Sequence, residues 1–253
     1  MSVRKRVSEF VKNNRFLKWV PNILTLCNSL CGFAAVLYTL RAYELSNYQQ
    51  MQAINVFAIS AWIIFFAMIF DAMDGFAARL FNAASMHGIQ MDSLSDMVTF
   101  GLAPATLVAI MTHFLRDWAL DRTQEIIVYL LCSIYLGCAA LRLATYNVHA
   151  MLEKKSGDKF SGLPSPGAAS AICVVVLFAR HAEIDIRFLS YMLPIYAAFL
   201  GLLMVSKIPY THMGKWLMSV KRNPKRMLML VVVLFTVAIF KVEALTFWVT
   251  GYI

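Results

Sequence analysis

Two uncharged apolar runs, each long enough to cross a membrane, meet at a short acidic segment. Residues 53–70 and 97–115 contain no Asp, Glu, Lys or Arg, and about 18 apolar residues suffice for a bilayer-spanning helix. Between them, Asp71 to Asp96 contains four of the chain's eight aspartates. A carboxylate at the centre of an apolar helix costs about 2.5–3.5 kcal/mol, and four together also repel one another. The fold must therefore bring cations or water to these side chains.

The spacing of the four aspartates indicates two helical faces. Asp71 and Asp74 are three residues apart, and Asp92 and Asp96 are four apart, so each pair projects from one side of a helix. Gly75, Ser85 and Gly88 lie between the pairs and are available for a turn that brings them face to face. Four hard oxygen ligands suit Mg²⁺, Mn²⁺ or Ca²⁺, and two such ions would balance the charge.

Composition places this segment in a membrane protein. The chain is 60% hydrophobic and 15% charged, with a mean hydropathy of +0.66, whereas soluble domains are about 25% charged. We therefore predict an all-α integral membrane protein with a six-helix transmembrane core, one or two C-terminal membrane segments and a possible N-terminal amphipathic surface helix. The predicted crossings are residues 19–40, 53–79, 92–115, 124–147, 167–182 and 188–206.

The basic residues predict the domain boundaries and the orientation. The net charge of +9 is concentrated in short segments that flank apolar runs, which favours anionic lipid headgroups over nucleic acid as the partner. We expect a basic interfacial segment at 1–18, a transmembrane domain at 19–206, a basic cytoplasmic loop at 207–226 and a membrane segment at 227–253, crossing once or forming a hairpin. Sixteen of the 23 Lys and Arg residues fall on the side of the N-terminus and the aspartates, which predicts a multi-pass inner-membrane protein whose active site faces the cytoplasm.

The acidic segment resembles the full signature of the CDP-alcohol phosphotransferase family. Eight residues stand at fixed offsets, and a motif of this length is specific. They are, in order, Asp71, Asp74, Gly75, Ala78, Arg79, Gly88, Asp92 and Asp96. The resemblance implies Mg²⁺ or Mn²⁺, with two ions held by the four aspartates, and Asp96 as the catalytic base. It also implies a homodimer and a binding site for CDP-diacylglycerol made of Asn22, Thr25, Asp71, Gly75, Ala78, Arg79, Ser85 and Gly88.

A second stretch resembles the phosphatidylserine synthase branch of this family. Arg142-Leu143-Ala144 is followed by Tyr146-Asn147 and then by the segment Phe160 to Pro166. The resemblance implies L-serine as the acceptor, and it departs from the branch at Thr145, where a second arginine is expected. An arginine deep in an apolar run is a functional candidate. The candidate serine-binding residues are Arg142, Asn147, Lys159 and Ser165.

Several alternatives remain open at this point. Asn22 can cap the first helix, Arg79 can reach the headgroups from a helix end, and Arg142 can be a structural partner of an aspartate. Glycerol 3-phosphate, inositol phosphate or choline can replace serine as the acceptor. A cation transporter or channel also places carboxylates in a membrane, but the aspartates cluster at one membrane edge and Arg79 lies among them.

Overall fold

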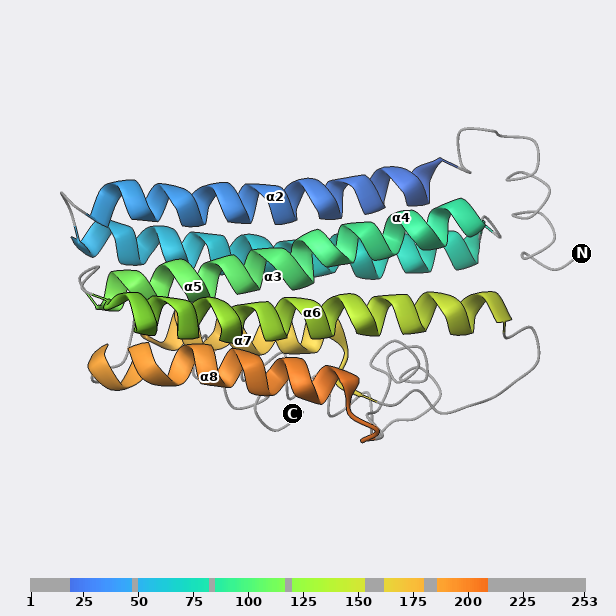
Figure 1. Cartoon of the computed structure of the whole chain (residues 1–253). Helices are drawn as coiled ribbons and strands as arrows, with labels where there is room; N and C mark the ends of the chain where they lie inside the picture. The colour runs from blue at the N-terminus through green and yellow to red at the C-terminus, as the bar shows by residue number, and fades with distance from the viewer. Residues whose placement is uncertain are drawn as a thin grey trace, which may run out of the picture.

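Long helices run side by side from one end of the molecule to the other (Figure 1). The computed structural model describes residues 19–46, 50–81, 85–116, 120–152, 162–179 and 186–208, and these ranges contain no strand. Lys159 and the segments predicted at 1–18 and 227–253 lie outside them, as does most of 207–226. The elements are α2 (Val20–Ser46), α3 (Gln50–Leu80), α4 (Met86–Asp96), the π-helical turn η2 (Met97–Leu102), α5 (Ala103–Leu115), α6 (Arg122–Leu152), α7 (Ser165–Ala179) and α8 (Ile186–Val205).

The lengths of these helices confirm the prediction of an all-α membrane protein. Five spans are long and apolar enough to cross a bilayer, and Ser165–Ala179 is a shorter apolar helix. One of the five, Met86–Leu115, is the continuous unit formed by α4, η2 and α5. Helix α3 has 31 residues, which is roughly 46 Å at 1.5 Å per residue and exceeds a hydrocarbon core of about 30 Å. The count of six crossings stays a prediction.

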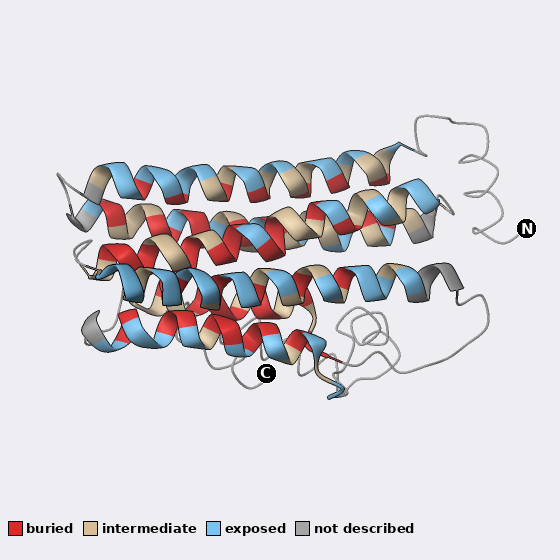
Figure 2. Ribbon diagram, in the orientation of Figure 1, coloured by how far each residue is buried: buried red, intermediate tan, exposed pale blue. Residues whose placement is uncertain are grey.

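Large apolar side chains on the outer faces of the bundle also fit a lipid environment. Figure 2 shows exposed residues along the outward side of the helices and buried residues between them. On α2, Leu26, Leu30, Phe33 and Leu37 are each about half exposed. A stripe of this kind is unfavourable in water, whereas in a bilayer it contacts the acyl chains.

Three predictions of local structure around the site are wrong. The third crossing begins at Met86 and not at Asp92, because Ser85 caps the helix by accepting a hydrogen bond from the Gly88 backbone N–H at 3.0 Å. Gly88 therefore lies in a helix and not in the turn, and Gly75 likewise lies within α3. Asn22 does not cap the first helix, since α2 already begins at Val20.

Small residues and hydroxyl groups hold α2 against α3. Ala35 and Ala42 on α2 are fully buried, and the neighbouring Thr39 hydroxyl lies 2.8 Å from the Ser60 hydroxyl of α3. Ser60 also donates to the Ala35 carbonyl at 2.8 Å. Close approach of small residues, reinforced by interhelical hydrogen bonds, is how helices associate where lipid removes the hydrophobic driving force.

The other face of α2 meets the π-helical turn at a glycine. A Cβ atom added to Gly32 would lie 2.4 Å from Thr99 Oγ1 and 2.7 Å from Thr99 Cα, so the contact admits no side chain. Thr99 uses this proximity to donate to the Asn28 carbonyl at 3.0 Å. Tyr135 of α6 donates to the Phe100 carbonyl at 2.8 Å, which satisfies a backbone group in the same turn. Helix α2 is therefore in contact with the turn that directly follows Asp96.

Substituting Gly32 by Ala should destabilise the protein, because the new methyl group meets the Thr99 backbone. We expect a loss of about 1–3 kcal/mol, typical of overpacking, seen as a lower melting temperature of the purified protein in detergent. Gly137→Ala is the matched control, since its added Cβ meets nothing within 4 Å and Ala is the better helix former by about 0.5–1 kcal/mol. Equal melting temperatures for the two variants would contradict the close contact.

Candidate active site

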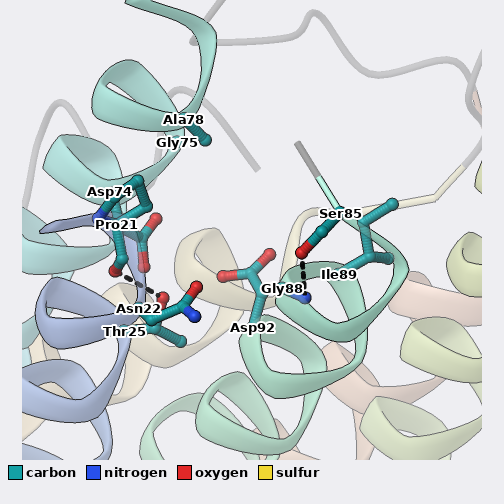
Figure 3. Close-up of a pocket in the computed structure, with 10 residues that line it drawn as sticks. All are labelled: Pro21, Asn22, Thr25, Asp74, Gly75, Ala78, Ser85, Gly88, Ile89 and Asp92. Carbon is teal, nitrogen blue, oxygen red and sulfur yellow. Dashed lines mark hydrogen bonds between the residues drawn. The ribbon is translucent and has the colours of Figure 1, made fainter. Parts of the chain in front are cut away.

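A pocket opens where the ends of α2, α3 and α4 meet. Its lining includes six of the residues that the sequence predicts to bind the nucleotide, contributed by all three helices (Figure 3). Small side chains at Gly75, Ala78 and Gly88 leave room for a ligand to approach the backbone. The ten residues that line the pocket are Pro21, Asn22, Thr25, Asp74, Gly75, Ala78, Ser85, Gly88, Ile89 and Asp92.

Three of the four predicted metal ligands converge at this pocket. Asp71 and Asp74 come from α3 and Asp92 comes from α4, and each offers one carboxylate oxygen such that all three atoms lie within 4.8 Å of one another. Carboxylate oxygens bind divalent cations at about 2.0–2.6 Å, so two oxygens on one ion lie no more than about 5 Å apart. The spacing therefore suits a shared ion.

Two oxygens of these carboxylates are available to bind a cation. Asp74 Oδ2 and Asp92 Oδ1 are buried and have no hydrogen-bond partner within the described ranges, and Asp74 is only 5% exposed. A buried carboxylate without a partner is strongly destabilising. Hard oxygen donors with unused lone pairs are the ligands that Mg²⁺ and Mn²⁺ prefer, so this set fits a divalent ion.

Asp96 lies beside these three carboxylates, and its side chain is within hydrogen-bonding reach of Asp71. It follows Asp92 by one helical turn, and its Oδ1 atom accepts a hydrogen bond from the side-chain amide of Asn28 at 3.2 Å. It is near enough to Asp71, Asp74 and Asp92 for their charges to interact. The four predicted ligands are thus neighbours, but only three offer oxygens within the 4.8 Å group.

The sequence analysis did not identify Asn28, although a signal was present. Asn22, Thr25 and Asn28 recur every three residues along an otherwise apolar helix, and such a row lies on one face. Ser95 donates to the Thr25 carbonyl at 2.9 Å, which joins this face of α2 directly to α4. The polar row is therefore the wall of α2 that faces the aspartates.

Comparison with known proteins agrees with this geometry. The family model for CDP-alcohol phosphatidyltransferase matches residues 18–252, nearly the whole chain. The chain belongs to the CDP-alcohol phosphatidyltransferase family. The recognition made from the signature is confirmed, and membership removes support for the cation-transporter alternative.

Curated relatives of this family member cover most of its length. A CDP-diacylglycerol–serine O-phosphatidyltransferase of Helicobacter pylori strain J99 is 29% identical over 92% of this chain and 87% of its own. An enzyme of the same name from Bacillus subtilis strain 168 is 30% identical over 79% of this chain and 93% of its own. An archaetidylserine synthase of Methanothermobacter thermautotrophicus is 27% identical over 81% of this chain and 72% of its own.

Of the predicted acceptor residues of this phosphatidyltransferase family member, Arg142 and Ser165 contact each other, whereas Asn147 has a different neighbour. Arg142 Nη1 donates to the hydroxyl of Ser165 at 2.6 Å, which joins α6 to the start of α7. Two other residues of α6 contact the helix that carries Asp96: Tyr135 donates to Phe100, and Asn147 accepts from Ser93 at 2.7 Å. Arg142 lies between Tyr135 and Asn147 along α6. Asp96 lies between Phe100 and Ser93 on the facing helix. Arg142 is therefore at the depth of Asp96.

Asn147 lines a different pocket from the aspartates. This second pocket lies between α4 and α6 and is mostly apolar, with Gln90, Ser93, Leu94, Met97, Ala140, Leu143, Ala144 and Asn147 in its wall. Arg79 is in the last turn of α3, but its side chain, like Lys159, lies outside what the structure describes. The roles assigned to Arg142, Asn147, Lys159 and Ser165 therefore stay predictions.

Replacing Asp74 by Asn should weaken divalent-metal binding, because it removes one charge from the three converging carboxylates. We expect the dissociation constant for Mn²⁺ to rise by about tenfold or more, as for loss of a hydrogen-bonded charge partner. The measurement is a titration of purified protein in detergent, followed by electron paramagnetic resonance of free Mn²⁺. Asp121→Asn is the matched control, since Asp121 is exposed and lies just before α6, away from the site. Equal affinities in the two variants would argue against the metal site.

Proposed function

We propose that this protein transfers the phosphatidyl group of CDP-diacylglycerol to the hydroxyl of L-serine, forming phosphatidylserine and releasing CMP. The observation that carries the proposal is the convergence of Asp71, Asp74 and Asp92 beside a pocket lined by the family's signature residues. Asp74 and Asp92 each have a buried oxygen with no hydrogen-bond partner in the described part of the chain. The names of the relatives support serine as the acceptor. Glycerol 3-phosphate, inositol phosphate and choline remain the alternatives within the family.

The pocket suits the polar head of CDP-diacylglycerol. Asn22, Thr25 and Ser85 offer hydrogen-bonding groups to the nucleotide, while the small residues on α3 and α4 let it approach the backbone. Arg79 at the end of α3 is the proposed ligand of a phosphate oxygen, because a guanidinium binds phosphate with two parallel hydrogen bonds. The acyl chains of the substrate would stay among the exposed apolar side chains of the helices.

The aspartates would hold the divalent ions, with Mg²⁺ or Mn²⁺ as the proposed metal and two ions as the proposed number. Asp71, Asp74 and Asp92 supply the converging oxygens, and Asp96 can add an oxygen from one turn further along. When bound, divalent metal neutralises the diphosphate and stabilises the charge that develops on it during transfer.

The transfer itself needs a base beside the incoming hydroxyl. The serine oxygen attacks the phosphorus that carries diacylglycerol, the bond from that phosphorus to the bridging oxygen breaks, and CMP leaves with that oxygen. Asp96 is the proposed acceptor of the hydroxyl proton, because it lies beside the three converging carboxylates and its side chain is oriented by Asn28. Arg142, at the depth of Asp96 and held by Ser165, is the proposed partner of the serine carboxylate, with Asn147 and Lys159 as further candidates.

The topology is compatible with a cytoplasmic active site in the inner membrane, which we also propose. The start of α2, the end of α3, the start of α4 and the end of α6 share one end of the bundle (Figure 1). The sequence predicts that 16 of the 23 Lys and Arg residues fall on the side of the N-terminus and the aspartates, which favours a cytoplasmic location for that side. A homodimer, as the family resemblance implies, is part of the same proposal.

An acceptor panel tests the function. Purified protein with Mn²⁺ or Mg²⁺ and CDP-diacylglycerol should release CMP when L-serine is added, and release little with glycerol 3-phosphate, inositol phosphate or choline. The measurement is CMP by chromatography and the lipid product by mass spectrometry. Activity with another acceptor but not with serine would overturn the serine assignment and leave the family activity standing.

Asp96→Asn should abolish most of the activity, because the amide cannot take the hydroxyl proton. We expect kcat to fall by about 10²–10⁴, the range that general-base catalysis contributes, while the melting temperature stays close to that of the unsubstituted protein. Asp121→Asn serves again as the control with unchanged kcat. An Asp96→Asn variant that turns over serine at the original rate would exclude Asp96 as the base.

A further inference from the structure

We propose that Asn28 selects the acceptor in addition to positioning Asp96. Its side-chain nitrogen orients the Asp96 carboxylate, and its side-chain oxygen accepts a hydrogen bond from the amino group of the incoming amino alcohol. The inference rests on the proposed function, since it concerns how that same site recognises serine.

Asn28 lies one helical turn beyond the last α2 residue that lines the pocket. Asn22 and Thr25 line the pocket from α2, and Asn28 continues the same row one turn deeper into the membrane. Asn28 is fully buried, and its neighbour across the helix interface is Asp96. A ligand that enters between α2 and α4 as far as the proposed base therefore arrives at Asn28.

The two ends of the Asn28 amide are used differently. The nitrogen donates to Asp96 at 3.2 Å, and this end must face Asp96 because an ionised carboxylate only accepts hydrogen bonds. The oxygen is then directed elsewhere, and it is buried with no hydrogen-bond partner within the described ranges. Buried side-chain oxygens almost always have a donor, so a lone one requires an explanation.

Neighbouring hydroxyl groups do not supply that donor. Thr99 donates to the backbone carbonyl of Asn28 and not to its side chain. Ser95 donates to the Thr25 carbonyl, and Thr25 donates to the Pro21 carbonyl. Each of these hydroxyls has a single proton, so the described residues leave Asn28 Oδ1 available to a donor on a bound molecule.

The amino group of serine is a suitable hydrogen-bond donor for Asn28 Oδ1. Its hydroxyl must approach Asp96 for proton transfer, and in serine the amino group is on the carbon next to the one that bears the hydroxyl. Asn28 Oδ1 is likewise close to Asp96, because it belongs to the same amide group whose nitrogen donates to the Asp96 carboxylate. A protonated amino group carries three donors, and a buried oxygen that accepts one of them gains a charge-assisted hydrogen bond. Acceptors without an amino group leave the oxygen unpaired.

The test compares two ligands that differ only in the amino group. L-Serine is assayed for KM by CMP release, and 3-hydroxypropionate, which is serine without its amino group, is assayed for its inhibition constant against serine. Asn28→Ala should raise the KM for serine by about tenfold or more, the effect expected for losing a hydrogen bond to a charged group. The inhibition constant of 3-hydroxypropionate should change by less than about threefold, because that ligand makes no such bond.

Asn28→Asp separates the two roles of the residue. Its carboxylate still accepts from an amino group but can no longer donate to Asp96, so kcat should fall by about tenfold or more while the KM for serine changes by less than about threefold. This variant also keeps the size of the side chain, so it serves where Asn28→Ala lowers the protein yield. A residue that only supports the fold is not expected to raise KM when replaced by Ala and to lower kcat at nearly constant KM when replaced by Asp.

Controls distinguish the ways in which the inference can fail. Thr39→Val, a buried substitution elsewhere on α2, should leave both constants unchanged. An equal rise of both constants in Asn28→Ala, or an Mn²⁺ affinity reduced as in Asp74→Asn, would overturn the inference by making Asn28 a packing residue or a metal ligand. An unchanged KM for serine in Asn28→Ala would overturn it while leaving the proposed function intact. Wild-type protein that releases no CMP with serine would instead overturn the proposed function first.

Discussion

Acidic side chains brought together inside apolar helices are the constraint on which this structure depends. Asp71, Asp74 and Asp92 place oxygens within 4.8 Å of one another. Two of these residues have buried oxygens that find no hydrogen-bond partner among the described residues. Repulsion between them disfavours this arrangement unless a cation is present. The same property suits the site to a divalent metal, and the role that we propose for this metal is to hold the diphosphate.

Contacts elsewhere in the bundle hold α2, α3 and α4 close together around this site. Helix α2 packs on α3 through alanines and the Thr39–Ser60 contact, and on the turn after Asp96 through Gly32. Ser95 and Thr99 then tie α4 and η2 to the backbone of α2. A π-helical turn next to a proposed base is a frequent feature of functional sites, and here it is stabilised from α6 by Tyr135.

Site residues at a fixed spacing along the chain could be predicted from the sequence, whereas those defined by contacts between distant segments could not. The signature aspartates, Asn22, Thr25 and Ser85 were all identified before the fold was known, and most of them line one pocket. The third crossing begins six residues before its predicted start, because Ser85 caps a helix where the sequence alone suggests a turn. Asn28 was overlooked because its contact with Asp96 joins residues 68 positions apart.

The amino-acid sequence alone determined that this chain is a helical membrane protein with a family-specific acidic motif, because apolar run length and residue spacing are local properties. Only the tertiary structure decided that three aspartates converge while Asp96 pairs with Asn28, and that Arg142 and Asn147 contact different neighbours. The physical reason is that these outcomes depend on the register and rotation of helices against one another. Those are set by packing at positions such as Gly32 and by interhelical hydrogen bonds, which no single segment encodes.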